Sequence, residues 1–196
     1  MITINEITIV RDGREIIYDY SEQIPAGSIT AIVGPNGCGK STLLAAIAGE
    51  IAPSKGTITI DELHPILTSP LQLARIRAVA IQNQKYTLGF TVKQVIEMAG
   101  PSEAVMQALD LTTLANRQVT TLSGGEAQRV SIATAIAQNT PVLLLDEPLA
   151  AQDVGSRTRI IELLQKLADD GVSVVVVAHS NESELTWADK VIKQFL

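Results

Sequence analysis

Gly34-Pro35-Asn36-Gly37-Cys38-Gly39-Lys40-Ser41 matches the sequence pattern G-x-x-x-x-G-K-[ST] at every fixed position. Its glycines let the backbone curl so tightly that successive N–H groups point inward, toward a polyphosphate. In this pattern the lysine reaches the β- and γ-phosphates of a nucleotide, and the serine hydroxyl binds Mg²⁺. The stretch therefore predicts a phosphate-binding loop that uses Mg²⁺ as its cofactor.

The residues on either side of the loop favour this interpretation over a glycine-rich turn that matches by chance. Residues 29–33 have the pattern of a short buried strand, and residues 41–50 have that of a helix. The positive end of the helix dipole would then point at the phosphates. We expect nucleotide contacts along the loop and into the first helical turn, from Gly34, Pro35, Asn36, Gly37, Cys38, Gly39, Lys40, Ser41 and Thr42.

The composition excludes several classes of protein. The chain has 196 residues, 46% of them hydrophobic, which is enough for one core or for a core with a subdomain. A net charge of −6 without a Lys/Arg cluster disfavours nucleic acid as a partner. Apolar stretches such as residues 172–178 are far shorter than the roughly 18 residues that a membrane helix needs.

Two further features bear on location. Residues 1–5 alternate like a strand and lack the charged and apolar regions of a secretory signal peptide. The single cysteine, Cys38, leaves no internal disulfide and suits a reducing compartment. We therefore expect a cytoplasmic protein, with any membrane association peripheral.

The order of patterns along the chain predicts an α/β fold. β-Branched residues and the turn at Asp12-Gly13 indicate strands near the N-terminus, and residues 92–138 are mostly helical in pattern. Strands buried on both faces with helices between them are typical of a parallel sheet. The expected strands of the chain are 29–33, 56–60, 77–83, 142–145 and 172–178, and a last strand lies within 191–196; the expected helices include 123–137 and 157–167.

Asp146 and Glu147 directly follow the apolar residues 142–145. If that strand neighbours the strand before the phosphate-binding loop, the two carboxylates lie beside the phosphates. Asp146 would then hold Mg²⁺, and Glu147 would polarise a water aimed at the γ-phosphate. The alternative is a solvated acidic turn, which an intact phosphate-binding loop makes less favourable.

A second anion site is predicted at Leu122-Ser123-Gly124-Gly125-Glu126. Ser123 and Glu126 have the spacing of a capping box, and two glycines at a helix start expose backbone N–H groups. A plain helix cap is the alternative. Two phosphate cradles for one nucleotide are hard to explain in a monomer.

Together these motifs resemble those of the ATP-binding subunits of ABC transporters, over nearly the whole chain. The resemblance implies a P-loop NTPase fold with a mostly parallel sheet, an N-terminal antiparallel β subdomain and a shortened helical insertion. It implies one ABC ATPase domain over residues 1–196, with the core at about 1–85 and 141–196 and the helical subdomain at about 86–140.

In that family the signature motif of one copy closes over the ATP of another. The resemblance thus implies a dimer with a second ATPase subunit, identical or related. The residues expected to contact the partner's ATP are Ser123, Gly124, Gly125 and Glu126.

The remaining family motifs carry over by position. His179 resembles the switch histidine that contacts the γ-phosphate, so the implied catalytic residues are Lys40, Glu147 and His179. Asp153 resembles the D-loop aspartate that couples the two sites, although Gln152 stands where leucine is usual.

The glutamine that would bind Mg²⁺ and water has two candidates. Gln84 fits the alignment of the preceding strand without a gap, whereas Gln82 fits the distance to Thr91-Val92 better. We assign Gln84, so the expected metal ligands are Ser41, Gln84 and Asp146.

Besides Gln152, two other places differ from the family's pattern or stand out within it. The aromatic residue that usually stacks on adenine is replaced by Arg11 or Asp12. The guanidinium group of Arg11 could stack on the base instead, and this predicts loose selectivity between bases. Cys38, within the phosphate-binding loop, is either a small space-filling residue or a thiol activated by the helix terminus and Lys40.

The resemblance implies ATP binding and hydrolysis that drive transport through transmembrane permease subunits, on the cytoplasmic face of the cell membrane. Residues 89–96 resemble subunits that import iron-siderophores, haem or cobalamin, whereas the brevity of the chain resembles small exporter subunits such as those for haem. An ABC ATPase without a membrane partner and a catalytically silent binding module are the other classes. The first would carry coiled coils or zinc modules, and the second conflicts with intact Lys40, Glu147 and His179.

Overall fold

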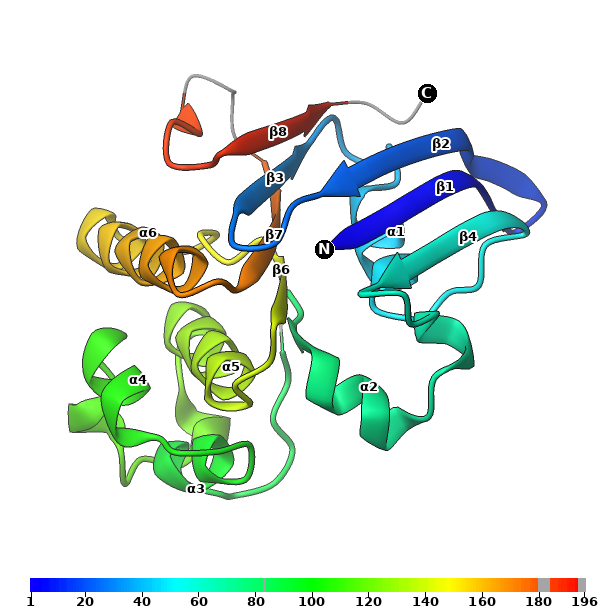
Figure 1. Cartoon of the computed structure of the whole chain (residues 1–196). Coiled ribbons are helices and arrows are strands. Elements are labelled where there is room, and N and C mark those ends of the chain that lie inside the picture. The colour runs from blue at the N-terminus through cyan, green and yellow to red at the C-terminus, as the bar shows by residue number, and fades with distance from the viewer. Residues whose placement is uncertain (83, 180–183, 194–196) are drawn as a thin grey trace.

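The computed structural model describes residues 1–82, 84–179 and 184–193. Within them the chain forms two sheets with helices around them (Figure 1). Part of the strand expected at 77–83 (Asn83) and the end of the one expected within 191–196 lie outside the described residues. The α/β fold with a mostly parallel sheet and an antiparallel N-terminal sheet is confirmed.

The larger sheet has five parallel strands in the order β5-β6-β7-β3-β8. Its central strands are buried on both faces, which explains their continuous apolar sequences. Alternate residues serve different cores: Leu143 and Leu145 face one, whereas Val142 and Leu144 face the other. The strands are β3 Ile29–Val33, β5 Arg77–Ala80, β6 Val142–Asp146, β7 Ser173–Ala178 and β8 Lys190–Lys193.

The smaller sheet is antiparallel, in the order β2-β1-β4, from β1 Ile2–Arg11, β2 Arg14–Ile24 and β4 Lys55–Ile60. The turn between β1 and β2 is at Asp12 and Gly13, whose φ angles of 51° and 73° suit a tight hairpin. Helix α1, Lys40–Ile47, packs its apolar residues into the core between this sheet and the larger one. Helix α1, which directly follows the phosphate-binding loop, is therefore packed against residues of both sheets.

The other face of the large sheet is covered by α5, Gly124–Ala137, and α6, Val154–Asp169 (Figure 1). Ile160, Leu164 and Ala168 of α6 recur every fourth residue and are buried, as the helical period requires. The short helices α3, Val92–Glu97, and α4, Glu103–Ala108, pack on α5 from outside. The 3₁₀ turns η1 to η3 are Pro65–Leu67, Thr112–Leu114 and Val119–Thr121.

Helix α2, Pro70–Ile76, was absent from the predicted elements. Its start is nonetheless encoded locally, because Ser69 caps it by accepting a hydrogen bond from the Gln72 N–H, and proline occupies the first helical position. No helix among the described residues is long and apolar enough to cross a membrane.

Candidate nucleotide-binding site

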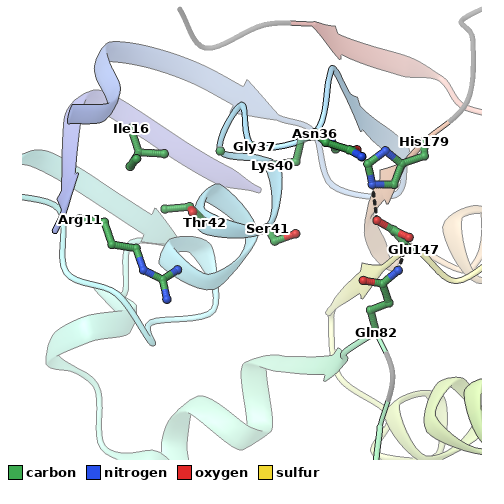
Figure 2. A pocket seen from close by; sticks show the side chains of 11 residues that line it. Arg11, Ile16, Asn36, Gly37, Lys40, Ser41, Thr42, Gln82, Glu147 and His179 are labelled. Carbon is green, nitrogen blue, oxygen red and sulfur yellow. Dashed lines mark hydrogen bonds and ion pairs between the residues drawn. The ribbon is translucent and has the colours of Figure 1, made fainter. Parts of the chain in front are cut away.

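A cavity of about 760 Å³ opens between the phosphate-binding loop and the ends of the central strands (Figure 2). Lys40 and Ser41 line it from the start of α1, and Glu147 and His179 line it from the residues after β6 and β7. Ligands of open α/β sheets bind at such carboxyl ends of strands. Six of the nine predicted residues of the loop and α1 lie in the lining, namely Asn36, Gly37, Gly39, Lys40, Ser41 and Thr42, whereas Gly34, Pro35 and Cys38 do not.

The phosphate-binding loop is bonded to the side chain of its own lysine, Lys40. Lys40 is only 5% exposed, and its Nζ donates hydrogen bonds to the carbonyl oxygens of Gly34 at 2.8 Å and Pro35 at 3.0 Å. Gly37 and Gly39 have φ angles of 79° and 101°, in the left-handed region that glycine tolerates best. The loop thus places a buried cation at its centre and its backbone around it.

Ser41 and Asp146 lie together at the same end of the cavity. Ser41 Oγ donates to Asp146 Oδ1 at 3.3 Å. Burial raises the pKa of Asp146, the hydrogen bond from Ser41 lowers it, and the neighbouring charge of Glu147 raises it further. We expected this arrangement on the condition that β6 neighbours β3, the strand before the loop. That condition was wrong, because β7 lies between β6 and β3 in the sheet.

Glu147 is held by two side chains. Gln82 Nε2 donates a hydrogen bond to its carboxylate, and His179 Nε2 pairs with it from the other side (Figure 2). Glu147 has a φ of 50°, an uncommon conformation for a residue with a side chain, which turns it away from the line of β6. Two of the three predicted catalytic residues, Glu147 and His179, therefore contact each other in the lining of the cavity.

The assignment of Gln84 is not supported by this arrangement. Gln82 lines the cavity with Lys40 and Glu147, whereas Gln84 lines a different pocket with Leu122 and Gly124. Both glutamines follow the end of β5 at Ala80. Gln82 is the one that the structure brings to Ser41 and Glu147 in the lining of the cavity.

The second predicted anion site lies away from this cavity. Ser123 caps α5 and accepts a hydrogen bond from the Glu126 N–H, while the Glu126 carboxylate accepts one from the Ser123 N–H at 2.7 Å. These hydrogen bonds, above all the one from the Ser123 backbone, lower the pKa of Glu126. Ser123, Gly124, Gly125 and Glu126 do not line the cavity of their own phosphate-binding loop.

Asp153 caps α6. Its carboxylate accepts hydrogen bonds from the Ser156 N–H at 2.9 Å and the Ser156 hydroxyl at 2.7 Å, and these lower its pKa. Next to it, Gln152 is buried and bonded to residues of α5. The sequence alone did not indicate these partners of Gln152.

Arg11 and Cys38 lie in different surroundings. Arg11 is exposed at the far side of the cavity, with Ile16 beside the loop (Figure 2). Ile16 was missed because one isoleucine in an alternating strand carries no signal of binding. Cys38 is only 7% exposed and belongs to the core cluster under α1, which favours its space-filling role.

Comparison with known proteins agrees with this geometry. The sequence pattern of a family described as ABC transporter matches residues 17–150. The chain is 42% identical over 194 residues to the hemin import ATP-binding protein of Nocardia farcinica, covering 91% of this chain and 67% of that protein. It is 39% identical over 197 residues to the cobalamin import ATP-binding protein of Halobacterium salinarum, covering 92% of this chain and 49% of that protein.

Solved structures show the same fold. A bacterial ABC transporter cassette, determined as a dimer, matches with a TM-score of 0.85 and 27% identity, covering 99% of this chain and 94% of that one. An ATP-binding subunit of another ABC transporter matches with a TM-score of 0.86 at 19% identity, covering 100% and 86%.

Proposed function

The chain belongs to the ABC transporter family and is an ATPase of that family, and from this premise we propose that it powers the import of haem or a related metal chelate. The observation that carries its chemistry is the meeting of Lys40, Ser41, Glu147 and His179 at one cavity. Its relatives include hemin import and cobalamin import ATP-binding proteins, which supports a metal chelate as the cargo and favours import over export.

Lys40 and the curled backbone are proposed to hold the β- and γ-phosphates of ATP. The oxygens of Ser41, Asp146 and Gln82 suit a hard cation such as Mg²⁺, which is commonly bound by one or two carboxylates together with substrate phosphates. When bound, Mg²⁺ would neutralise phosphate charge. Thr42 and the loop residues complete the proposed contacts.

Glu147 is proposed to act on water. Its carboxylate would accept a proton as the water oxygen bonds to the γ-phosphorus and the bond to the β-phosphate oxygen breaks, releasing ADP and phosphate. Gln82 and His179 contact that carboxylate, so they would hold it at the mouth of the cavity. His179 would also contact the γ-phosphate.

A second subunit, identical or related, is proposed to complete the site. Ser123, Gly124, Gly125 and Glu126 lie away from their own cavity, so they are free to face the nucleotide of a partner. Asp153 would couple the two sites. Transmembrane permease subunits would dock this dimer on the cytoplasmic face of the membrane. In the same proposal the chain is a single ABC ATPase domain, with its core at about 1–85 and 141–196 and its helical subdomain at about 86–140.

The ATPase mechanism is tested with Glu147→Gln. The variant should bind ATP but hydrolyse it roughly a hundredfold or more slowly than wild type. With ATP it should form a dimer detectable by light scattering, because the closed state no longer resets. A variant that remains monomeric with saturating ATP contradicts the mechanism.

The cargo is tested in cells that carry the gene. Deletion should abolish growth on haem as the iron source, with wild type but not Glu147→Gln restoring it. Undiminished growth on haem together with lost uptake of cobalamin would overturn the haem assignment while leaving the ATPase assignment intact.

A further inference from the structure

The loop between Glu147 and α6 contains a buried amide that the proposed chemistry does not use. Gln152 is only 7% exposed. Its Nε2 donates a hydrogen bond to the Gly125 carbonyl oxygen at 3.0 Å, and its Oε1 accepts one from Arg129 Nη1 at 3.1 Å. Both ends of one side chain are therefore bonded to the first turns of α5, on which the signature residues lie.

The backbones also touch at this point. A Cβ added to Gly125 would lie 2.8 Å from the Ala151 carbonyl oxygen, so the helix turn and the loop can approach this closely only with glycine there. Ala151 has a φ of 55°, an uncommon conformation for a residue with a side chain. The hydrogen bond from Gln152 to Gly125 therefore joins two segments, the loop at 151–152 and the first turn of α5, whose backbones are already closely packed.

A second connection runs parallel to the first. Arg129 Nη1 also lies 3.4 Å from Ser156 Oγ, and that hydroxyl donates to Asp153 Oδ2 at 2.7 Å. Ser156, in the middle of this connection, is 3% exposed, whereas Asp153 at its end is exposed. The cation of α5 is thus linked through one hydroxyl to the carboxylate that caps α6.

We propose that Gln152 is a positioning residue that fixes the signature turn of α5 to the loop after Glu147, so that the two move as one unit. The proposal rests on the proposed function, in which that turn faces a partner's nucleotide. The direction of the bond matters, because the amide donor of Gln152 holds the Gly125 carbonyl oxygen of this turn. A leucine would fill the space without setting this orientation.

Two substitutions separate the bonds of Gln152. Gln152→Leu removes both, whereas Gln152→Glu keeps an acceptor for Arg129 and loses the donor to Gly125, since an ionised carboxylate only accepts. Gln165→Leu, on the exposed side of α6, serves as the matched control. All three are made in the Glu147→Gln background, and ATP-driven dimerisation is measured by analytical ultracentrifugation.

Both Gln152 variants lose the hydrogen bond to the Gly125 carbonyl oxygen and should for that reason weaken the ATP-bound dimer about tenfold, the effect expected for one lost buried hydrogen bond. Affinity of the monomer for a fluorescent ATP analogue, measured at a protein concentration too low for dimers, should change by less than about twofold, as should the dimer of the control. A role in folding alone would instead lower monomer affinity and melting temperature together with dimerisation.

Three results would overturn the proposal: parental dimerisation in both Gln152 variants, weakening in Gln152→Leu alone, or parallel loss of monomer affinity. The second would assign the effect to Arg129 and not to the Gly125 carbonyl. A parent variant that never dimerises would overturn the proposed function itself, and this proposal with it, so the two failures are told apart by the parent.

Discussion

The Ser41 hydroxyl donates a hydrogen bond to Asp146 Oδ1 at 3.3 Å, although 105 residues separate the two along the chain. The strands that precede them are not neighbours, since β7 lies between β3 and β6. The contact forms because α1 starts directly after the loop and lies over the sheet, packing against β6 as well as β7. A hydroxyl and a carboxylate are thereby placed side by side as a pair of oxygen ligands.

Asp146→Asn should therefore weaken Mg²⁺-dependent ATP binding at least tenfold, because a neutral amide is a poorer ligand for a hard cation than a carboxylate. Titration of a fluorescent ATP analogue with Mg²⁺ or with a chelator measures this. Binding in chelator should be nearly unchanged, and equal losses in both conditions would contradict the assignment.

The same carboxylate predicts a pH dependence. Burial raises the pKa of Asp146, so it takes up a proton at a higher pH than an ordinary aspartate does. Since the protonated form binds cations poorly, Mg²⁺-dependent ATP affinity should fall as pH drops, beginning above the usual aspartate range. The fall should disappear in Asp146→Asn; an identical profile in that variant would assign it to another group.

Gln82 and Gln84 are distinguished by their surroundings. Gln82→Ala should lower the rate of ATP hydrolysis about tenfold or more, because it removes the hydrogen bond to Glu147. Gln84→Ala is the matched control and should keep a rate within about twofold of wild type. Steady-state phosphate release measures both, and the reverse order of effects would restore the assignment of Gln84.

Arg11 and Ile16 offer the base no aromatic partner at the cavity. We expect ATP and GTP to bind within about tenfold of each other, a difference of about 1.4 kcal/mol. Arg11→Ala should weaken both nucleotides to a similar degree, as loss of a stacked guanidinium would. Competition titrations measure the ratio, and a much stronger preference for ATP in the wild type would count against the prediction.

Cys38 is buried under α1, so its role should be one of packing. Cys38→Ala is expected to keep at least about half of the wild-type rate of ATP hydrolysis. N-ethylmaleimide should label native Cys38 slowly, as followed by mass spectrometry. Fast labelling that abolishes activity and is blocked by ATP would instead support the activated thiol.

Glu126 gives a pH-dependent contribution to stability. Its folded pKa is lowered, chiefly by the Ser123 backbone N–H, so the stabilisation is complete above the unfolded pKa and is lost as pH falls through the lower, folded value. Thermal melting between pH 7 and strongly acid pH should show less loss in Glu126→Gln than in wild type. Parallel curves of melting temperature against pH for the two proteins would contradict a contribution of Glu126 to this pH dependence.

Local sequence was sufficient wherever one segment carries its own physical reason. The capping box at Ser123 and Glu126, the tight turn at Asp12-Gly13 and the buried strand 29–33 depend on neighbours along the chain, and each prediction is confirmed. Helix α2 was missed because its short amphipathic stretch gives a weak period. The choice between Gln82 and Gln84 could not be made from the sequence, because the path of the chain after the strand decides which side chain lines the cavity.

By itself, the sequence determined the phosphate-binding loop, the carboxylates after a buried strand and the capped signature helix, because each is a short pattern whose residue types imply its chemistry. Only the tertiary structure decided which of them meet. Strand order placed β7 between β6 and β3, the path of the chain after β5 placed Gln82 in the lining of the cavity, and close backbone contact at Gly125 allowed Gln152 to join α5 to the loop. Such meetings depend on packing between segments far apart in the chain, which no local pattern encodes.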